Sequence, residues 1–173
     1  MAFCNQTLAG ISLDCANNKG GIKEVYIANY GDVTAVTESE GKVSEITMAA
    51  SAKFKRYNFR KNTGSMTSTL NVDETTGINF VRTELSLVFT KMETPKRLEV
   101  SALALGQLAV IVKDSNDIYW YLGKDDYVSS SAGTGQTGTA KTDSNNYSIT
   151  LAVEEDTYPF EVDATVIDGI VEE

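Results

Sequence analysis

The side chains that most often do chemistry in enzymes are scarce in this sequence. Its 173 residues include no histidine and only two cysteines, Cys4 and Cys15. Histidine is the commonest general base and metal ligand, so its absence excludes histidine-containing triads and most zinc enzymes. Two thiols are too few for a zinc site within one chain. We expect both to be free rather than joined in a disulfide, as in a reducing cytosol.

Three further patterns resemble known sites but lack essential parts. A G-x-G-x-x-G pattern at 133–138 matches a dinucleotide-binding loop, but a Ser-rich stretch precedes it and a poor helix sequence follows. Residues 114–117 lack the glycine and glutamate that a calcium loop places sixth and twelfth, and they predict a plain hairpin turn. The paired acids at 154–156 and 172–173 are interpreted as surface charge. We therefore expect no enzyme, no cofactor and no metal site.

The layout of charge is more informative than these motifs. The net charge is −9, from 15 bases and 24 acids. Five bases fall within nine positions: Lys53, Lys55, Arg56, Arg60 and Lys61. Residues 154–173 hold eight acids and no base. The acidic segment of one molecule could meet the basic strand of the next, head to tail. The alternatives are pairing within one chain and two separate solvated surfaces. The other 24 acids and 10 bases argue against a nucleic-acid binder.

An aromatic triplet offers a different function. Tyr119, Trp120 and Tyr121 could form a stacking platform for a sugar or a base. In an alternating strand the two tyrosines share one face and the tryptophan takes the other. Core packing with a tyrosine at the rim is the commoner use of such a triplet.

Period-two patterns rich in Val, Ile, Thr, Tyr and Phe predict a mainly β protein. The expected strands cover 24–30, 43–48, 53–61, 65–73, 78–91, 107–113, 118–122 and 147–153, with a last one within 160–171. Asn62-Thr63-Gly64 predicts a hairpin that joins 53–61 to 65–73. Residues 129–146 have no apolar periodicity and predict an exposed, mobile loop.

One helix is predicted over 94–105. Thr94 suits its N-cap, Pro95 its first turn and Gly106 its C-terminal cap. The helix carries two apolar stripes, Leu98, Ala102 and Leu105 on one side and Val100 and Leu103 on the other. Two stripes indicate cover on both sides, by the core and by a neighbouring subunit. The alternative is a helix half-sunk between a sheet and a loop.

Together these elements predict a single domain over residues 1–173. Its fold class is an antiparallel two-sheet β-sandwich or barrel with one flanking helix. The N-terminus is expected to be flexible, 129–146 mobile, and 154–173 an acidic C-terminal segment. The longest apolar runs, such as 108–112, are far shorter than the ~20 residues of a membrane span, so no membrane anchor is expected.

The order of segments resembles the tail tube proteins of tailed bacteriophages, in particular those of phages and prophages of Bacteroidetes. Four stretches carry the resemblance: Leu13-Asp-Cys15 with Gly20 to Ala28, the strand pair 54–72, the helix and hairpin 96–123, and Gly135-Gln-Thr-Gly138 leading to Asn146–Leu151. None of them is a catalytic motif, so the resemblance rests on order and spacing. The acidic residues after Glu154 have no counterpart in it.

The resemblance implies a structural virion protein made in the bacterial host cytoplasm. Six copies would close a ring by joining sheets edge to edge, and rings would stack into a tube through which DNA passes without specific binding. Its partners would be further copies of itself and other tail or connector proteins. The residues expected at subunit interfaces are Lys53, Lys55, Arg56, Arg60, Lys61, Val100, Leu103, Gly133 and Gly135. Alternatives are a ring-forming head–tail connector or tail terminator, and a monomeric β-sandwich that binds glycans or decorates a surface.

Overall fold

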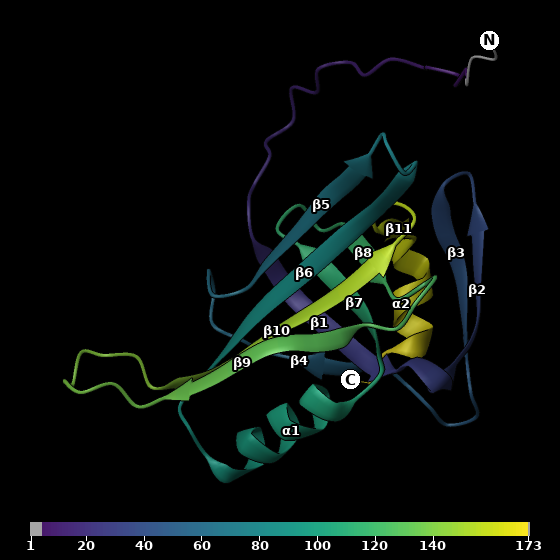
Figure 1. Ribbon diagram of the computed structural model, residues 1–173. Coiled ribbons are helices and arrows are strands. Elements are labelled where there is room, and N and C mark those ends of the chain that lie inside the picture. Colours follow the sequence, from purple (N-terminus) through teal and green to yellow (C-terminus); the bar gives the residue numbers. More distant parts are fainter. Residues whose placement is uncertain (1–4, 173) are drawn as a thin grey trace.

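The computed structural model describes residues 5–172 and shows two β-sheets packed face to face, with one helix along their end (Figure 1). The first half of the chain forms β1 (Ile22–Asn29), the 3-10 turn η1 (Tyr30–Asp32), β2 (Val33–Ser39), β3 (Lys42–Met48), β4 (Lys55–Tyr57), β5 (Ser65–Asp73) and β6 (Ile78–Thr90). The second half forms α1 (Thr94–Leu105), β7 (Leu108–Asp114), β8 (Tyr119–Leu122), β9 (Ser129–Gln136), β10 (Asn146–Glu155), β11 (Phe160–Val162) and α2 (Ala164–Ile170).

The larger sheet has seven strands in the order β2-β3-β11-β8-β7-β1-β4. All its pairs are antiparallel except β11 with β3. The hairpin of β7 and β8 around the turn 114–117 is the one that the sequence predicts. In that turn Asp114 Oδ1 accepts bonds from the backbone N–H groups of Asn116 (2.8 Å) and Ile118 (3.0 Å), which is the ordinary role of aspartate in a turn.

The smaller sheet has four strands in the order β5-β6-β10-β9. Along β6, Val81, Thr83, Leu85, Leu87 and Phe89 are buried in alternation, so the strand predicted over 78–91 is buried on one face only. Each sheet begins and ends with an unclosed edge strand, so the architecture is a sandwich and not a barrel.

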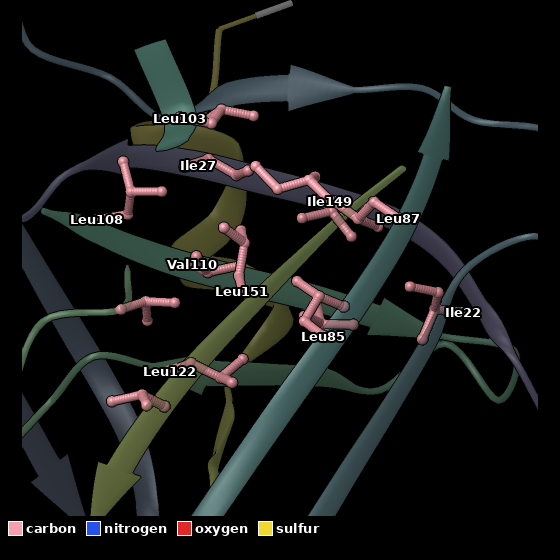
Figure 2. Close-up of a cluster of buried hydrophobic side chains, with 14 of the residues drawn as sticks. Ile22, Ile27, Leu85, Leu87, Leu103, Leu108, Val110, Leu122, Ile149 and Leu151 are labelled. Carbon is pink, nitrogen blue, oxygen red and sulfur yellow. The ribbon is translucent and has the colours of Figure 1, made fainter. Parts of the chain in front are cut away.

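The main core fills the space between the sheets. Leu85 and Leu87 of β6 and Leu151 of β10 face Ile27 and Val110 of the larger sheet (Figure 2). These side chains are almost fully buried. Since burial of apolar side chains is the dominant favourable contribution to folding, this layer fixes the two sheets against each other.

A second core lies on the opposite face of the larger sheet, where α2 covers it. Ile167 and Ile170 of α2 pack with Ile111 and Tyr121 of the central strands. Strands with cover on both faces read as continuous apolar runs, which is why β7 is the run Leu-Ala-Val-Ile-Val. The last strand predicted within 160–171 is β11, which ends at Val162. Asp163 caps α2 by accepting the N–H of Thr165 (3.0 Å).

Two predictions about connections are wrong. Residues 53–61 and 65–73 do not form a hairpin, because β4 pairs with β1 in the larger sheet and β5 pairs with β6 in the smaller one. The loop at 62–64 crosses between sheets. Residues 129–146 are not one long loop either, since β9 pairs along β10 and only 137–145 form the connection. Backbone pairing with a strongly apolar neighbour makes a strand of a segment that has no apolar pattern.

The two ends of the described chain behave differently. Residues 5–21 have no helix or strand and are exposed, with Cys15 as a free thiol; Cys4 lies outside the described residues. The acidic segment from Glu154 is not a solvated tail. It supplies the end of β10, β11 and α2, and its last part is held by Phe54, whose N–H bonds to Ile170 (2.9 Å) and whose carbonyl accepts from Glu172 (2.9 Å).

Candidate subunit interface

Two of the predicted interface bases make ion pairs within their own chain. Lys55 and Arg56 lie on β4, the short strand at one edge of the larger sheet. Lys55 pairs with Glu172 and Arg56 with Glu24 of β1. The acidic C-terminal segment therefore meets the basic strand in the same molecule, one of the alternatives left open by the sequence. Because these ion pairs neutralise the charges of Lys55 and Arg56, the two bases contribute little to an ion pair with a neighbouring subunit.

The other three bases keep their charge available. Lys53, Arg60 and Lys61 flank β4 and are exposed. Within residues 5–172, none of them has a carboxylate oxygen within 4.0 Å. They leave a positive rim on this edge of the molecule.

Helix α1 has the predicted bounds, but its two faces are exchanged. Leu103 is only 3% exposed and belongs to the main core, and Val100 packs beside it. Leu98 and Leu105 are 58% and 90% exposed. The assignment of Val100 and Leu103 to a face that meets a neighbour is therefore wrong for Leu103, which its own chain covers. The sequence could not decide this, because both stripes had similar apolar content. The N-cap is Glu93, one residue before the predicted Thr94, and its side chain makes no capping bond.

The edge strands of the smaller sheet are unusual in composition. β9 reads Ser-Ser-Ser-Ala-Gly-Thr-Gly-Gln and has no charged residue, and β5 has only Asp73 at its end. Natural edge strands are normally protected by lysine, proline or cover from another element. Residues 5–172 provide no strand that pairs with the outer side of either, although α1 packs against β9.

Gly133 and Gly135, both predicted at an interface, lie on β9. A Cβ on Gly135 would come within 2.9 Å of the Tyr147 ring, whereas one on Gly133 would meet only a carbonyl oxygen at 3.4 Å. Gly135 is therefore required by its own β10 neighbour. The G-x-G-x-x-G pattern begins in a strand of the sheet and has no helix after it.

The outer face of the smaller sheet, which points away from the core, is polar. Arg82 lies in its middle and bonds to Glu84 (3.0 Å) and Glu154 (2.9 Å). Around this group the outward positions carry hydroxyl groups, on Thr67, Thr69, Ser86, Thr134, Ser148 and Thr150. The face thus combines short hydroxyl side chains with one cation against two carboxylates.

The connection 137–145 extends β9 and β10 beyond the body of the molecule (Figure 1). Asp143 accepts the N–H groups of Thr139 and Ala140, each at 2.7 Å, and these bonds lower the pKa of its carboxyl group. At the other end, Met92 donates its N–H to Asn145 Oδ1 (2.8 Å). The projecting connection therefore has a defined shape.

A cleft of about 550 Å³ separates α1 from the corner where β1 and β4 meet. Tyr57 of β4 donates a hydrogen bond to Glu99 of α1 across one side of it. Burial, and then this carboxylate, raise the pKa of Tyr57, so the phenol stays protonated. The floor is apolar, with Ile27, Leu103 and Leu108. No sequence signal pointed to this cleft, because its walls come from segments far apart in the chain.

The side chains that could do chemistry are not brought together. Tyr121 is buried and Trp120 packs on the main core while donating to Asp114 (3.1 Å), so the aromatic triplet offers no open stacking platform. The described residues contain no group of three or more Asp, Glu or Cys that could hold a metal ion. None of the helices described is long and apolar enough to cross a membrane.

One buried carboxylate escaped the sequence analysis. Glu155 ends β10, and its Oε1 accepts the N–H groups of Gly123 (3.3 Å), Lys124 (2.7 Å) and Asp125 (3.2 Å). Burial raises its pKa despite these bonds. In the sequence it is one of a run of three acids, and nothing there distinguishes it from Glu154, which is exposed. Its three hydrogen bonds hold the turn after β8.

In comparisons with known proteins, no protein-family model, no curated protein and no solved structure matches the chain.

Proposed function

We propose that this protein is a self-assembling structural subunit whose copies close into rings through the edges of the four-stranded sheet, and that these rings stack into a bacteriophage tail tube. The observation that carries the proposal is the pair of edge strands without a strand partner on their outer side, β5 with nine residues and β9 with eight. An exposed edge of this length is a template for another strand. Pairing of β5 of one copy with β9 of the next would satisfy the free backbone N–H and C=O groups of both edges.

Pairing of two different edges is a heterologous contact, which closes into a ring when the rotation between copies permits it. Six copies, as the resemblance implies, would make one continuous sheet around the ring. The glycines of β9 allow close approach of a neighbouring backbone. The bases Lys53, Arg60 and Lys61 would then lie at the periphery, available to further contacts.

The outer face of the smaller sheet suits the wall of a channel for DNA. Its two carboxylates and one arginine give it a net negative charge in its middle, and its other outward groups are mostly short hydroxyls, with Phe80, Val88 and Ala152 between them. Phosphate groups bind where lysine and arginine neutralise them. A wall with this composition repels a passing duplex, which would slide without being held.

Size-exclusion chromatography with light scattering, and negative-stain images of the same fractions, test the proposal. We expect rings or tubes with an open lumen. Long tubes would favour a tail tube, and single rings would favour a connector or terminator.

A charged edge provides the matched test. Thr67→Lys with Thr69→Lys places two lysines on exposed positions of β5, and Thr37→Lys places one on β2, the edge of the other sheet. We expect the β5 variant to be monomeric and the β2 variant to assemble as the unmodified protein does. A monomeric unmodified protein at high concentration over a range of salt would overturn the proposal, as would a β5 variant that still closes rings.

A further inference from the structure

The N-terminal arm, residues 5–14, exposes three large apolar side chains that its own chain leaves uncovered. Leu8, Ile11 and Leu13 are each at least 89% exposed. Isolated apolar residues are normal on a protein surface, but three of them on one short extended segment are typical of a segment that binds elsewhere.

The base of the arm is fixed while the rest of it leaves the body. Lys19 donates its N–H to Asn116 Oδ1 (2.9 Å), and the Asn116 amide donates to Asn18 Oδ1 (3.0 Å). Asn116 belongs to the turn between β7 and β8, so this turn anchors the arm. An extended chain of ten residues spans up to about 33 Å, enough to reach a neighbouring molecule.

The cleft between α1 and the β1–β4 corner has the matching properties. The floor of the cleft is apolar. At its edge, the exposed Ala102 of α1 has a small side chain that does not block entry. A volume of about 550 Å³ is in the range of clefts that bury several side chains. The exposed Leu105 lies one turn further along the same helix.

One lysine of the cleft is available to the single acidic residue of the arm. Asp14 is the only charged residue of the arm. Three acids and two lysines line the cleft: Asp32 accepts from Asn29 and Glu99 from Tyr57, both neutral donors, and Glu172 pairs with Lys55. Lys53 also lines the cleft and has no carboxylate partner among residues 5–172, so the cleft offers one free cation to an acidic segment.

The positions of arm and cleft favour a second copy as the occupant. The arm enters β1 at Ile22, whereas the cleft is lined by the other end of that strand, Ile27 to Asn29. Figure 1 shows the arm leaving the body on the side away from α1. An arm that reached the cleft of its own chain would have to reverse and run back along the whole strand.

We infer that the arm of one copy docks in the α1–β4 cleft of the next copy, as a head-to-tail contact between stacked rings. A head-to-tail contact whose rotation does not close a ring generates an open stack of copies. The role in stacking rests on the proposed ring function, but the contact between arm and cleft does not.

Cross-linking tests the contact directly. In a chain with Cys4→Ser and Cys15→Ser, Ile11→Cys is combined with Ala102→Cys at the cleft or, as the matched control, with Ala104→Cys, which is exposed on α1 outside the cleft. Under mild oxidation we expect a ladder of disulfide-linked chains for position 102, at least fivefold stronger than for position 104. Mixing isotope-labelled and unlabelled chains identifies links between molecules. Equal ladders, no ladder, or links only within one chain would overturn the inference.

A second variant separates this inference from the ring. Leu8→Ser, Ile11→Ser and Leu13→Ser alter only exposed positions, so the body should fold unchanged. We expect rings to remain while the mean tube length falls at least tenfold. Tubes of unchanged length would overturn the role of the arm and leave the ring intact. A ladder from position 102 without any rings would instead overturn the proposed function and leave the contact intact.

Discussion

Tyr121 tests whether the buried polar groups of the second core have hydrogen-bond partners. Its side chain is 1% exposed, and its hydroxyl group has no hydrogen-bond partner among the described residues. Burial, with the nearby Tyr30 and Glu155, raises its pKa, so the group remains a neutral phenol. A buried polar group without a partner costs roughly 1–3 kcal/mol. Tyr121→Phe removes that group and keeps the ring, so the variant should be more stable, although a small void offsets part of the gain.

We expect Tyr121→Phe to raise the free energy of unfolding by about 1 kcal/mol and Tm by about 2–4 °C, as is usual for a domain of this size. Tyr26→Phe is the matched control. Tyr26 belongs to the same core and is also buried, but its hydroxyl donates to the carboxylate of Glu24. Loss of that bond should cost about 1–2 kcal/mol.

Urea unfolding followed by circular dichroism at neutral pH measures the free energy of unfolding of both variants. An unchanged dependence of this free energy on urea concentration indicates that unfolding remains two-state. Opposite signs for the two substitutions are the expected result. If Tyr121→Phe destabilises the protein as much as Tyr26→Phe does, then the Tyr121 hydroxyl is satisfied and the reasoning about this core fails.

Three further predictions concern single positions. Because burial raises the pKa of Glu155, the folded state holds its proton to higher pH than the unfolded state does; stability should fall as pH rises from 4.5 through the raised pKa, and urea titrations of Glu155→Gln should lack this component. Leu151→Ala empties a fully buried position and should cost about 2–5 kcal/mol in the same titrations, whereas a loss below about 1 kcal/mol would contradict the described packing. Gly135→Ala should lower Tm by a few degrees because its Cβ meets the Tyr147 ring, and Gly133→Ala should leave Tm almost unchanged; equal effects would contradict the geometry of β9.

Most of the fold follows from patterns that local physics makes explicit. The alternation along 78–91 predicts β6 and its buried face, and the aspartate-rich turn at 114–117 predicts the β7–β8 hairpin. Pro95 and Gly106 mark a helix whose bounds agree with α1. In each case the signal lies within a short stretch of sequence, and tertiary contacts reinforce it.

The errors occur where a distant neighbour decides the structure. β9 has no apolar pattern of its own, and its pairing with β10 makes it a strand. The turn signal at 62–64 is real, but β4 and β5 have better partners in different sheets.

The candidate interface shows the same limit. Composition identified the basic cluster, but not which of its charges remain available. Lys55 and Arg56 are neutralised by Glu172 and Glu24, which are far away in the sequence. Both apolar stripes of α1 were visible, yet only the packing shows that Leu103 is the buried one. Unprotected edges, in contrast, could have been recognised from the absence of lysine and proline in β5 and β9, once these were known to be edges.

The strand order also determines when each part of the sheets can form during synthesis of the chain. β11 lies between β3 and β8, so the β2–β3 hairpin joins its sheet only through a strand encoded late in the sequence. β9, one of the two edges proposed to join copies, is encoded late as well. A nascent chain therefore lacks the β9 edge until β1 to β8 have been made. Under the proposed assembly, chains on the same messenger RNA are protected from joining prematurely by the order in which their strands are made.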